Sequence, residues 1–360
     1  MSMFVEPSEL LAGIRNGKWL DQQDFPPLAY AVPGMIPEGS VLLVGPPKIG
    51  KSWLVQDITL AAAAGGKSLG LDIPKRPVLY LALEDGDRRL QDRCRKLLGG
   101  DPIPAEFEYL TRAEPGRILD TVVEWLDLQS APALVVLDTL GKVMPPALQG
   151  ESAYLRDYRV GNALKRIADE RPGMTLLVNH HDRKANAEDF IDSVSGTHGL
   201  AGAADTVVVL TRARHEEEGL LKVTGRDVPE GEYAVRFVDG SAWVLDGKDL
   251  GEAARRARDA RVTAGLGDRS VEVVELVGEH PDGITPTQVA DELGMDRGDA
   301  GTYLRRALAA NRIRRPSRGL YTPVFSVSSV ADPGDTKDGK DAPPGRLPGV
   351  DPDDPGRWTR

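Results

Sequence analysis

Residues 41–53 read VLLVGPPKIGKSW, an apolar run that ends abruptly in glycine, proline, lysine and serine. The continuous run of Val and Leu is typical of a strand that is buried on both faces of a sheet. From Gly45 to Ser52 the residues fit the pattern GxxxxGK[ST], and the segment SWLVQDITLAAAA that follows is typical of a helix. A strand, a glycine-rich loop and a helix in this order predict that backbone N–H groups of the loop surround phosphate oxygens.

The positions of this loop predict ATP and Mg²⁺ as cofactors. Lys51 is expected to neutralise negative charge on the β- and γ-phosphates, and the Ser52 hydroxyl is expected to bind Mg²⁺. The alternative is a Gly-Pro turn that binds no ligand. The predicted nucleotide-binding residues are Gly45, Pro46, Pro47, Lys48, Ile49, Gly50, Lys51, Ser52 and Trp53.

The composition narrows the class of protein. The 360 residues carry a formal net charge of −10, one cysteine and five histidines, and this length predicts two or three folding units. No CxxC or HxxxH spacing occurs, so disulfides and structural zinc are poorly supported and a cytoplasmic location is expected. No apolar segment of about 18 residues occurs, so no membrane partner is expected. The negative charge argues against a surface broadly adapted to nucleic acid, although a local basic patch can still bind phosphate.

From 36 to 250 the sequence predicts an α/β domain. Short β-branched or leucine-rich runs alternate there with longer mixed segments, as in a mainly parallel sheet flanked by helices. The pair Asp239-Gly240 is a hairpin signal and predicts that antiparallel strands complete the sheet. The expected strands are SVLLV (40–44), PVLYLAL (77–83), ALVVLD (133–138), TLLVN (175–179), TVVVL (206–210), LLKVT (220–224), YAVRF (233–237) and AWVL (242–245).

The rest of the chain is expected to form four further parts. Residues 251–268 form a charged helical linker with few large apolar groups. Residues 269–325 contain three helical segments and a hairpin, the pattern of a winged helix-turn-helix domain with Gly294 before its third helix. Residues 1–35 are an N-terminal segment and a candidate for a subunit contact. Residues 326–360, rich in Asp, Pro and Gly, form a disordered tail.

Carboxylates follow two of the expected strands. Asp138 ends ALVVLD beside the phosphate loop, where it can hold the water shell of Mg²⁺; a cap for the residues that follow is the alternative. Glu84 comes at the end of the strand after the phosphate loop and is the predicted catalytic base, which orients and polarises the attacking water. Asp85 is the alternative base, and a solvated turn pair would have no catalytic role.

Together these segments resemble the RecA-like P-loop ATPases, specifically the RepA-type hexameric plasmid helicases and the related KaiC and DnaB branches. The resemblance covers about 36–246 and rests, in order, on VGPPKIGKS, LALED, LVVLDTL, LLVNHHDRK and LKVTGRD. It implies a RecA-like ATPase core that forms a homo-oligomer, expected to be a hexamer, with single-stranded DNA in its channel. Many ring ATPases carry a catalytic Glu directly after the aspartate, whereas this chain has Thr139, so the base must come from elsewhere.

The resemblance also implies a phosphate sensor and a residue that acts on a neighbour. His180 in LLVNHH occupies the place of a polar residue that senses the γ-phosphate, and His181 can exchange roles with it. Arg226 in VTGRD matches a basic residue that reaches the ATP of a neighbouring subunit.

One position departs from this pattern. Related helicases often carry a lysine two residues before the arginine, where this chain has Thr224. Arg212 or Arg214 in LTRAR is a candidate to compensate. A surface salt bridge remains the alternative for each of these arginines.

Two regions are candidates for DNA contacts. The segment HDRKANAEDF, with Arg183 and Lys184, corresponds to loops that face the channel in RecA-like rings, although a plain surface loop fits it equally well. Residues 300–325 contain six arginines and no carboxylate, which predicts a positive third helix and wing that bind duplex DNA; protein docking is the alternative. The arginines are Arg305, Arg306, Arg312, Arg314, Arg315 and Arg318.

The sequence therefore favours an ATP-hydrolysing, ring-forming DNA motor or loader, a RepA-like helicase that serves replication of a plasmid, phage or integrated element. An ATP-gated DNA-binding regulator that displaces no strand is the alternative. A P-loop small-molecule kinase is a third class. It is weakened by Glu84, Arg226 and the C-terminal domain, because kinases work without an arginine from a neighbour.

Overall fold

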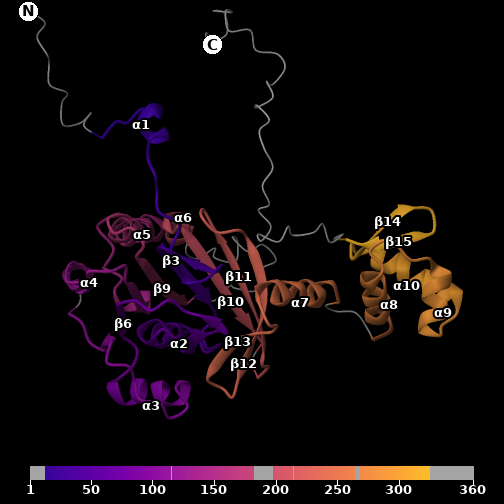
Figure 1. Ribbon diagram of the computed structural model, residues 1–360, viewed down its shortest axis with the longest axis horizontal. Helices are drawn as coiled ribbons and strands as arrows, with labels where there is room; N and C mark the ends of the chain where they lie inside the picture. Colours follow the sequence, from indigo (N-terminus) through magenta and orange to yellow (C-terminus); the bar gives the residue numbers. More distant parts are fainter. Residues whose placement is uncertain (1–12, 115, 182–197, 214, 264–267, 325–360) are drawn as a thin grey trace, which may run out of the picture. The chain divides into compact units, whose positions relative to one another are not determined.

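The computed structural model describes residues 13–114, 116–181, 198–213, 215–263 and 268–324. These residues form two compact units, with the division between Ala264 and Gly265. The first unit is a nine-stranded sheet with helices on both faces (Figure 1), and the second is a small helical unit with a hairpin. None of the described helices combines the length and the apolar character that a membrane crossing requires.

The sheet has the strand order β13-β12-β11-β10-β3-β9-β8-β6-β7. Six neighbouring strands, from β7 to β10, run parallel, and β11, β12 and β13 extend the sheet antiparallel. The strands are β3 (Gly39–Gly45), β6 (Val78–Ala82), β7 (Phe107–Leu110), β8 (Leu134–Asp138), β9 (Thr175–His181), β10 (Thr206–Arg212), β11 (Glu218–Gly225), β12 (Gly231–Val238) and β13 (Ala242–Leu245).

All eight predicted strands are present, and the mixed character of the sheet confirms the α/β prediction. The hairpin between β12 and β13 turns at Asp239 and Gly240, whose φ angles are 50° and 64°. Two successive left-handed residues are what a tight type I′ hairpin requires. The edge strand β7 was not predicted, because its sequence FEYL is short and only Phe107 is fully buried.

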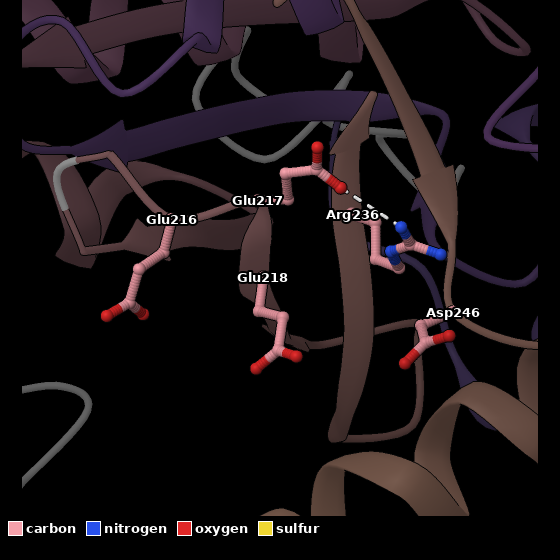
Figure 2. Close-up of a pocket in the computed structure, with 5 residues that line it drawn as sticks. All are labelled: Glu216, Glu217, Glu218, Arg236 and Asp246. Atoms are coloured by element: carbon pink, nitrogen blue, oxygen red, sulfur yellow. Dashed lines mark hydrogen bonds and ion pairs between the residues drawn. The ribbon is translucent and has the colours of Figure 1, made fainter. Parts of the chain in front are cut away.

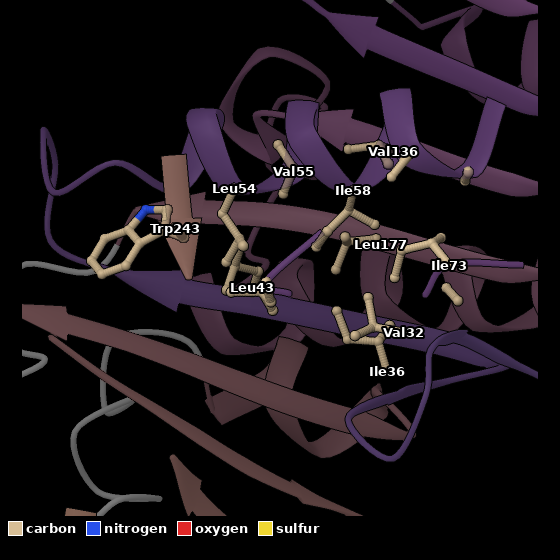
Figure 3. Close-up of a cluster of buried hydrophobic side chains, with 14 of the residues drawn as sticks. Val32, Ile36, Leu43, Leu54, Val55, Ile58, Ile73, Val136, Leu177 and Trp243 are labelled. Atoms are coloured by element: carbon tan, nitrogen blue, oxygen red, sulfur yellow. The ribbon is translucent and has the colours of Figure 1, made fainter. Parts of the chain in front are cut away.

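Helices cover both faces of the sheet. One face carries α2 (Lys51–Ala64) and α3 (Asp87–Leu97), and the other carries α4 (Ile118–Asp127), α5 (Ala153–Asp169) and α6 (His198–Ala203). Successive side chains of a strand point to opposite faces. Leu43 therefore packs with α2, where Figure 3 shows it below Leu54, and Leu42 packs with α5. The parallel strands are buried on both sides, as their continuous apolar runs predict.

Short elements complete the first unit. They are α1 (Gly17–Asp21), β1 (Tyr30–Val32), β2 (Ile36–Pro37), β4 (Lys67–Ser68), β5 (Leu71–Asp72) and a 3-10 turn (Leu140–Lys142). Ala31, Val32 and Met35 are buried, so the core of this unit begins about five residues before the predicted start at 36.

The segment predicted as a linker over 251–268 largely belongs to the first unit. Helix α7 (Leu250–Thr263) packs against β12 and buries Ala253 and Ala257. Arg256 binds Asp246, and Arg261 binds Glu232 at 3.3 Å. The small alanine side chains allow α7 to approach the sheet closely. The sequence prediction, which relied on the number of large apolar residues, did not reveal this packing.

The second unit is a winged helix-turn-helix, as predicted. It comprises α8 (Asp268–Glu279), α9 (Pro286–Leu293), α10 (Arg297–Ala309), β14 (Ile313–Ser317) and β15 (Leu320–Pro323). Thr285 caps α9 in a reciprocal capping box with Gln288, and Gly294 ends α9 in the left-handed conformation at φ 59°. Its core includes Val277, Val289, Leu304 and Tyr321.

Candidate nucleotide-binding and catalytic site

Four segments that the sequence predicts for the site meet at the carboxyl edge of the parallel strands. The phosphate loop follows β3, Glu84 follows β6, Asp138 ends β8 and His181 ends β9. Since β6, β8, β9 and β3 are adjacent and parallel, their carboxyl ends lie side by side. The topology therefore gathers residues that are 130 positions apart in the chain.

The phosphate loop has the backbone that phosphate binding requires. Lys48 and Gly50 adopt left-handed φ angles of 68° and 104°, and Ile49 is buried and anchors the loop. A Cβ atom at Gly50 would lie 2.8 Å from Trp243 Nε1, so only glycine fits. The Trp243 indole donates a hydrogen bond to the Gly50 carbonyl at 3.0 Å. β13 thus supports the start of α2, whose N–H groups are suited to an anion.

Lys51 is buried at the first turn of α2. Its Nζ donates to the carbonyls of Gly45 at 2.7 Å and Pro46 at 2.9 Å, and lies 3.0 Å from Nδ1 of His181. Burial lowers the pKa of the Lys51 ammonium to about 8, against the attraction of Asp138 and Glu84. The cation therefore occupies a desolvated position in which an anionic phosphate would stabilise it.

Asp138 is only 2% exposed and is held by three side-chain donors. Tyr80 donates to Oδ2 at 2.9 Å, Asn179 donates to Oδ1 at 2.5 Å, and Ser52 also forms a hydrogen bond. Burial raises the pKa of Asp138, and these three hydrogen bonds oppose the rise. The contact between Ser52 and Asp138 joins the two residues that the sequence predicts as metal ligands.

Glu84 and Asp85 have different environments. Glu84 accepts a hydrogen bond from Thr139 Oγ1 at 3.1 Å, and its side chain is 43% exposed. Asp85 is 5% exposed and forms ion pairs with Arg93 and Arg89 of α3. The guanidinium of Arg93 also lies over the Trp53 ring, 5.3 Å from its centroid. Asp85 is thus part of the packing of α3, whereas Glu84 faces solvent beside the phosphate loop.

The two predicted histidines lie on opposite faces of β9. His181 contacts Lys51 through Nδ1, and its Nε2 lies 3.7 Å from Glu84. His180 precedes it by one residue, so the alternation along the strand directs His180 toward the face that carries α5. Of the pair, the structure places His181 between Lys51 and Glu84.

Asn179 and Tyr80 are site residues that the sequence interpretation missed. Asn179 lies two residues before His181, so the two side chains point to the same face of the strand. This spacing was the signal in the sequence that could have identified Asn179. Tyr80 lies inside an apolar strand and gave no signal, because tyrosine is common in buried strands. Burial beside Asp138 holds the pKa of Tyr80 well above its usual value, so its hydroxyl remains a donor.

Aromatic rings and an arginine lie beside the loop on its other side. The guanidinium of Arg212 lies 4.4 Å from the centroid of Phe237 and 5.7 Å from that of Trp243. The two rings pack at a centroid distance of 5.0 Å. Arg212 is the last residue of β10, which runs parallel to β3, and it therefore lies at the same edge as the phosphate loop.

Arg226 lies at the opposite edge of the sheet. β11 runs antiparallel to β10, so its last residue, Gly225, pairs with Thr206. Thr206 in turn pairs with Val41, near the start of β3. Arg226 contacts Asp205 at 3.3 Å and is 58% exposed. The seven residues of β3 separate it from the phosphate loop of its own chain by about 20 Å. Arg212, at the other edge, does not stand beside Arg226, and Arg214 lies outside the described residues.

An acidic pocket of about 550 Å³ is lined by none of the residues that the sequence predicts for the site. Figure 2 shows Glu217 directed toward Arg236, at 3.0 Å, with Glu216, Glu218 and Asp246 around them. Four carboxylates against one arginine repel a triphosphate, so this pocket does not suit nucleotide.

In the winged helix, five of the six arginines are exposed and Arg312 is half-buried. Arg305 and Arg306 lie on α10, and Arg314, Arg315 and Arg318 lie on or beside the wing. Tyr321 is buried beneath Arg315, whose guanidinium lies 5.6 Å from the ring centroid, in agreement with a packing role for this tyrosine. The candidate channel residues Arg183 and Lys184 lie outside the described residues.

Comparisons with known proteins agree with this architecture. Residues 6–187, half of the chain, match a family described as an AAA domain, and residues 271–324 match one described as a transcriptional regulator, AbiEi antitoxin. The DNA repair protein RadA of Streptococcus pyogenes, in serotypes M1, M6 and M18, is 25% identical over 190 residues.

These alignments cover 52% of this chain and 36% of each RadA protein, so the chain spans about a third of the length of these curated relatives. A solved DnaB-like replicative helicase, described with its interactions with primase, matches with 14% identity and a TM-score of 0.45, over 57% of each chain. With the phosphate loop, the buried aspartate and the mixed sheet in place, the chain belongs to the AAA domain family, as a RecA-like P-loop protein with a C-terminal winged helix.

Proposed function

We propose that this protein is a cytoplasmic ATPase that works as a ring-forming DNA motor or loader in replication of a plasmid, phage or integrated element. The observation that supports this best is the meeting of Lys51, Asp138 and Glu84 at one edge of the sheet. A phosphate-binding cation, a buried carboxylate and a solvent-facing carboxylate are the groups that phosphoryl transfer to water needs.

The donor set fits Mg²⁺. Ser52 and Asp138 offer hard oxygen atoms that already share a hydrogen bond. Within the part of the chain that the structure describes, no group of three or more His, Cys, Asp and Glu residues could hold a metal. This suits an ion that takes one or two protein ligands and completes its shell with phosphate and water. Bound Mg²⁺ would neutralise charge on the β- and γ-phosphates.

Glu84 is the proposed base. The water oxygen bonds to the γ-phosphorus, the bond to the bridging oxygen of ADP breaks, and a water proton passes to the Glu84 carboxylate. Lys51 supplies positive charge to the phosphates, and His181, in contact with both Lys51 and Glu84, is the better placed of the two histidines to respond to the γ-phosphate. Asp85 is the weaker candidate base because arginines already neutralise it.

A ring would explain the position of Arg226. The residue cannot reach the phosphate loop of its own chain, about 20 Å away, but its side chain is 58% exposed beside Asp205, where another subunit can approach it. The N-terminal segment is the proposed subunit contact, because it exposes large apolar side chains. These are Ile14, Trp19, Leu20 and Phe25, which are 70%, 42%, 58% and 66% exposed.

DNA is the proposed partner of both units. The exposed arginines of α10 and the wing suit the phosphates of duplex DNA. In the first unit, Tyr154 and Tyr158 of α5 are 54% and 43% exposed, with nearly parallel rings. They lie near the carboxyl edge, because α5 begins after β8, and exposed aromatic rings can stack on the bases of a single strand.

Turnover of ATP by the full chain, with and without single-stranded DNA and with a mass measurement in the same buffer, tests this proposal. Glu84→Gln should bind ATP and lose turnover, because only the water-polarising carboxylate is removed. Asp85→Asn is the matched control and should lower thermal stability more than turnover. Full turnover by Glu84→Gln together with loss in Asp85→Asn would assign the base to Asp85.

The alternative is a nucleotide-gated DNA-binding regulator that displaces no strand. The match of the second unit to a family of transcriptional regulators favours it. A motor should hydrolyse ATP faster on single-stranded DNA and separate a duplex from an overhang. A regulator should bind duplex DNA in a nucleotide-dependent manner and show neither effect.

A further inference from the structure

Thr139 occupies the position directly after Asp138, where many ring ATPases carry a catalytic Glu, and the proposed function leaves it without a task. The residue follows the carboxyl end of β8 and is only 2% exposed. A buried hydroxyl needs a hydrogen-bond partner. The structure gives it one, the carboxylate of Glu84.

The contact has a defined geometry. Thr139 Oγ1 donates to Oε1 of Glu84 at 3.1 Å, and the Nε2 atom of His181 lies 3.7 Å from Oε2. The two oxygens of Glu84 therefore face different neighbours. Because the Thr139 hydroxyl occupies only one oxygen, the lone pairs of the second oxygen remain available to a water molecule.

The backbone around this contact is also fixed. Leu83 donates its N–H to the carbonyl of Asp138 at 2.8 Å, and Ala82 pairs with Asp138 in the ladder between β6 and β8. The branched side chain of Thr139 has few rotamers and is enclosed by protein. By contrast, the Glu84 side chain is 43% exposed and has three rotatable bonds, so the hydroxyl is the better-ordered partner.

We propose that Thr139 is a positioning residue, which holds Oε1 of Glu84 so that the other carboxylate oxygen faces the attacking water. This rests on the proposed role of Glu84 as the base. Thr139 thereby supports the carboxylate of Glu84, which follows the neighbouring strand β6. The chain carries no carboxylate directly after Asp138, where Thr139 stands. A poorly oriented base is costly, because proton transfer requires hydrogen-bond reach to the water.

Two substitutions in the full chain separate the hydroxyl from the shape of the side chain. Thr139→Val keeps the branched shape and removes the donor, and Thr139→Ser keeps the donor. We expect the valine variant to lower kcat about tenfold, since a hydrogen bond to a charged group is worth about that factor. Its affinity for ATP, measured with a fluorescent ATP analogue, should stay within about twofold of the parent value, and the serine variant should restore most of kcat.

A double-variant cycle with Glu84→Gln distinguishes this role from simple packing. If Thr139 acts through the carboxylate, adding Thr139→Val to Glu84→Gln should change single-turnover hydrolysis by less than about twofold. Thermal unfolding of each variant checks that the fold is retained.

Three results would overturn the inference: parent-like kcat in Thr139→Val, the same loss in Thr139→Ser, or a full additional loss in the double variant. A parent-like kcat in Glu84→Gln is a different failure. It would show that Glu84 is not the base, which contradicts the proposed function whatever the Thr139 variants do.

Discussion

At the residue scale, Lys51 shows how burial and charge oppose each other in this site. The residue is 3% exposed, and the pKa of its ammonium is lowered to about 8 chiefly by loss of solvent, although Asp138 and Glu84 attract it. Binding of a phosphate adds negative charge and raises this pKa again. Protonation of Lys51 and phosphate binding are therefore coupled.

This coupling predicts that affinity for ATP falls above pH 8, by about tenfold per pH unit, because the neutral lysine must take up a proton when phosphate binds. Titration with a fluorescent ATP analogue between pH 7 and 9.5 measures it. Lys51→Arg is the matched control, since a guanidinium does not titrate in this range. An equal loss in both proteins would assign the effect to another group.

At the element scale, helix α2 carries a half-buried carboxyl, Asp57, away from the site. Asp57 accepts a hydrogen bond from Ser68 of β4 at 2.5 Å. Burial raises the pKa of the Asp57 carboxyl to about 6, and the Ser68 hydroxyl opposes the rise. The ionised form is therefore the costly one in the fold.

The sign of this shift gives a stability prediction. The folded-state pKa of Asp57 is raised from 3.8 to about 6, so the protonated carboxyl contributes most to the free energy of unfolding below pH 4. This contribution, up to about 3 kcal/mol, is lost as pH rises through 6. Asp57→Asn should therefore raise the melting temperature at pH 7 and leave it nearly unchanged at pH 4, as followed by circular dichroism. Asp72→Asn on β5 is the control, because Asp72 is 88% exposed and its salt bridge contributes little. A destabilised Asp57→Asn at pH 7 would contradict the prediction.

At the scale of the whole molecule, the sheet separates two charged positions. Lys51 lies at the carboxyl edge and Arg226 at the amino edge, where Asp205 holds it. One subunit alone cannot bring both to the same phosphate. If Arg226 acts on ATP, the nucleotide must therefore be bound by another subunit.

If Arg226 acts on a neighbouring nucleotide, Arg226→Ala and Lys51→Ala should each be inactive alone and regain part of the ATP turnover when mixed. An intact loop from one subunit would then meet an intact arginine from the other. Turnover across mixing ratios, with subunit exchange confirmed by mass measurement, tests this. A mixture that stays inactive at every ratio argues for a salt bridge with Asp205 as the whole role of Arg226.

The second unit predicts a separable DNA contact. Arg314→Glu with Arg315→Glu should weaken binding to duplex DNA and reduce its salt slope by about two units, because each phosphate contact contributes about one, while basal ATP turnover is kept. Arg255→Glu with Arg258→Glu on α7 is the control with the same change in net charge. Fluorescence anisotropy at several salt concentrations measures both. Equal weakening by the two pairs would favour general charge over a winged-helix contact.

The sequence by itself determined the features that depend on local pattern. The apolar runs and the glycine-rich loop predicted β3 and α2, the Asp239-Gly240 pair predicted the hairpin of β12 and β13, and Gly294 predicted the helix turn of the second unit. These features follow from backbone sterics and from side-chain periodicity within about ten residues, so they can be read without knowing the tertiary structure.

Only the tertiary structure decided which side chains meet. The contact of Thr139 with Glu84 spans 55 residues, and that of His181 with Lys51 spans 130, so each depends on the order of β6, β8, β9 and β3 in the sheet. The edge at which Arg226 lies depends on the antiparallel direction of β11. Strand order and direction come from burial of the whole sheet and from chain connectivity, and no local segment of the sequence encodes them.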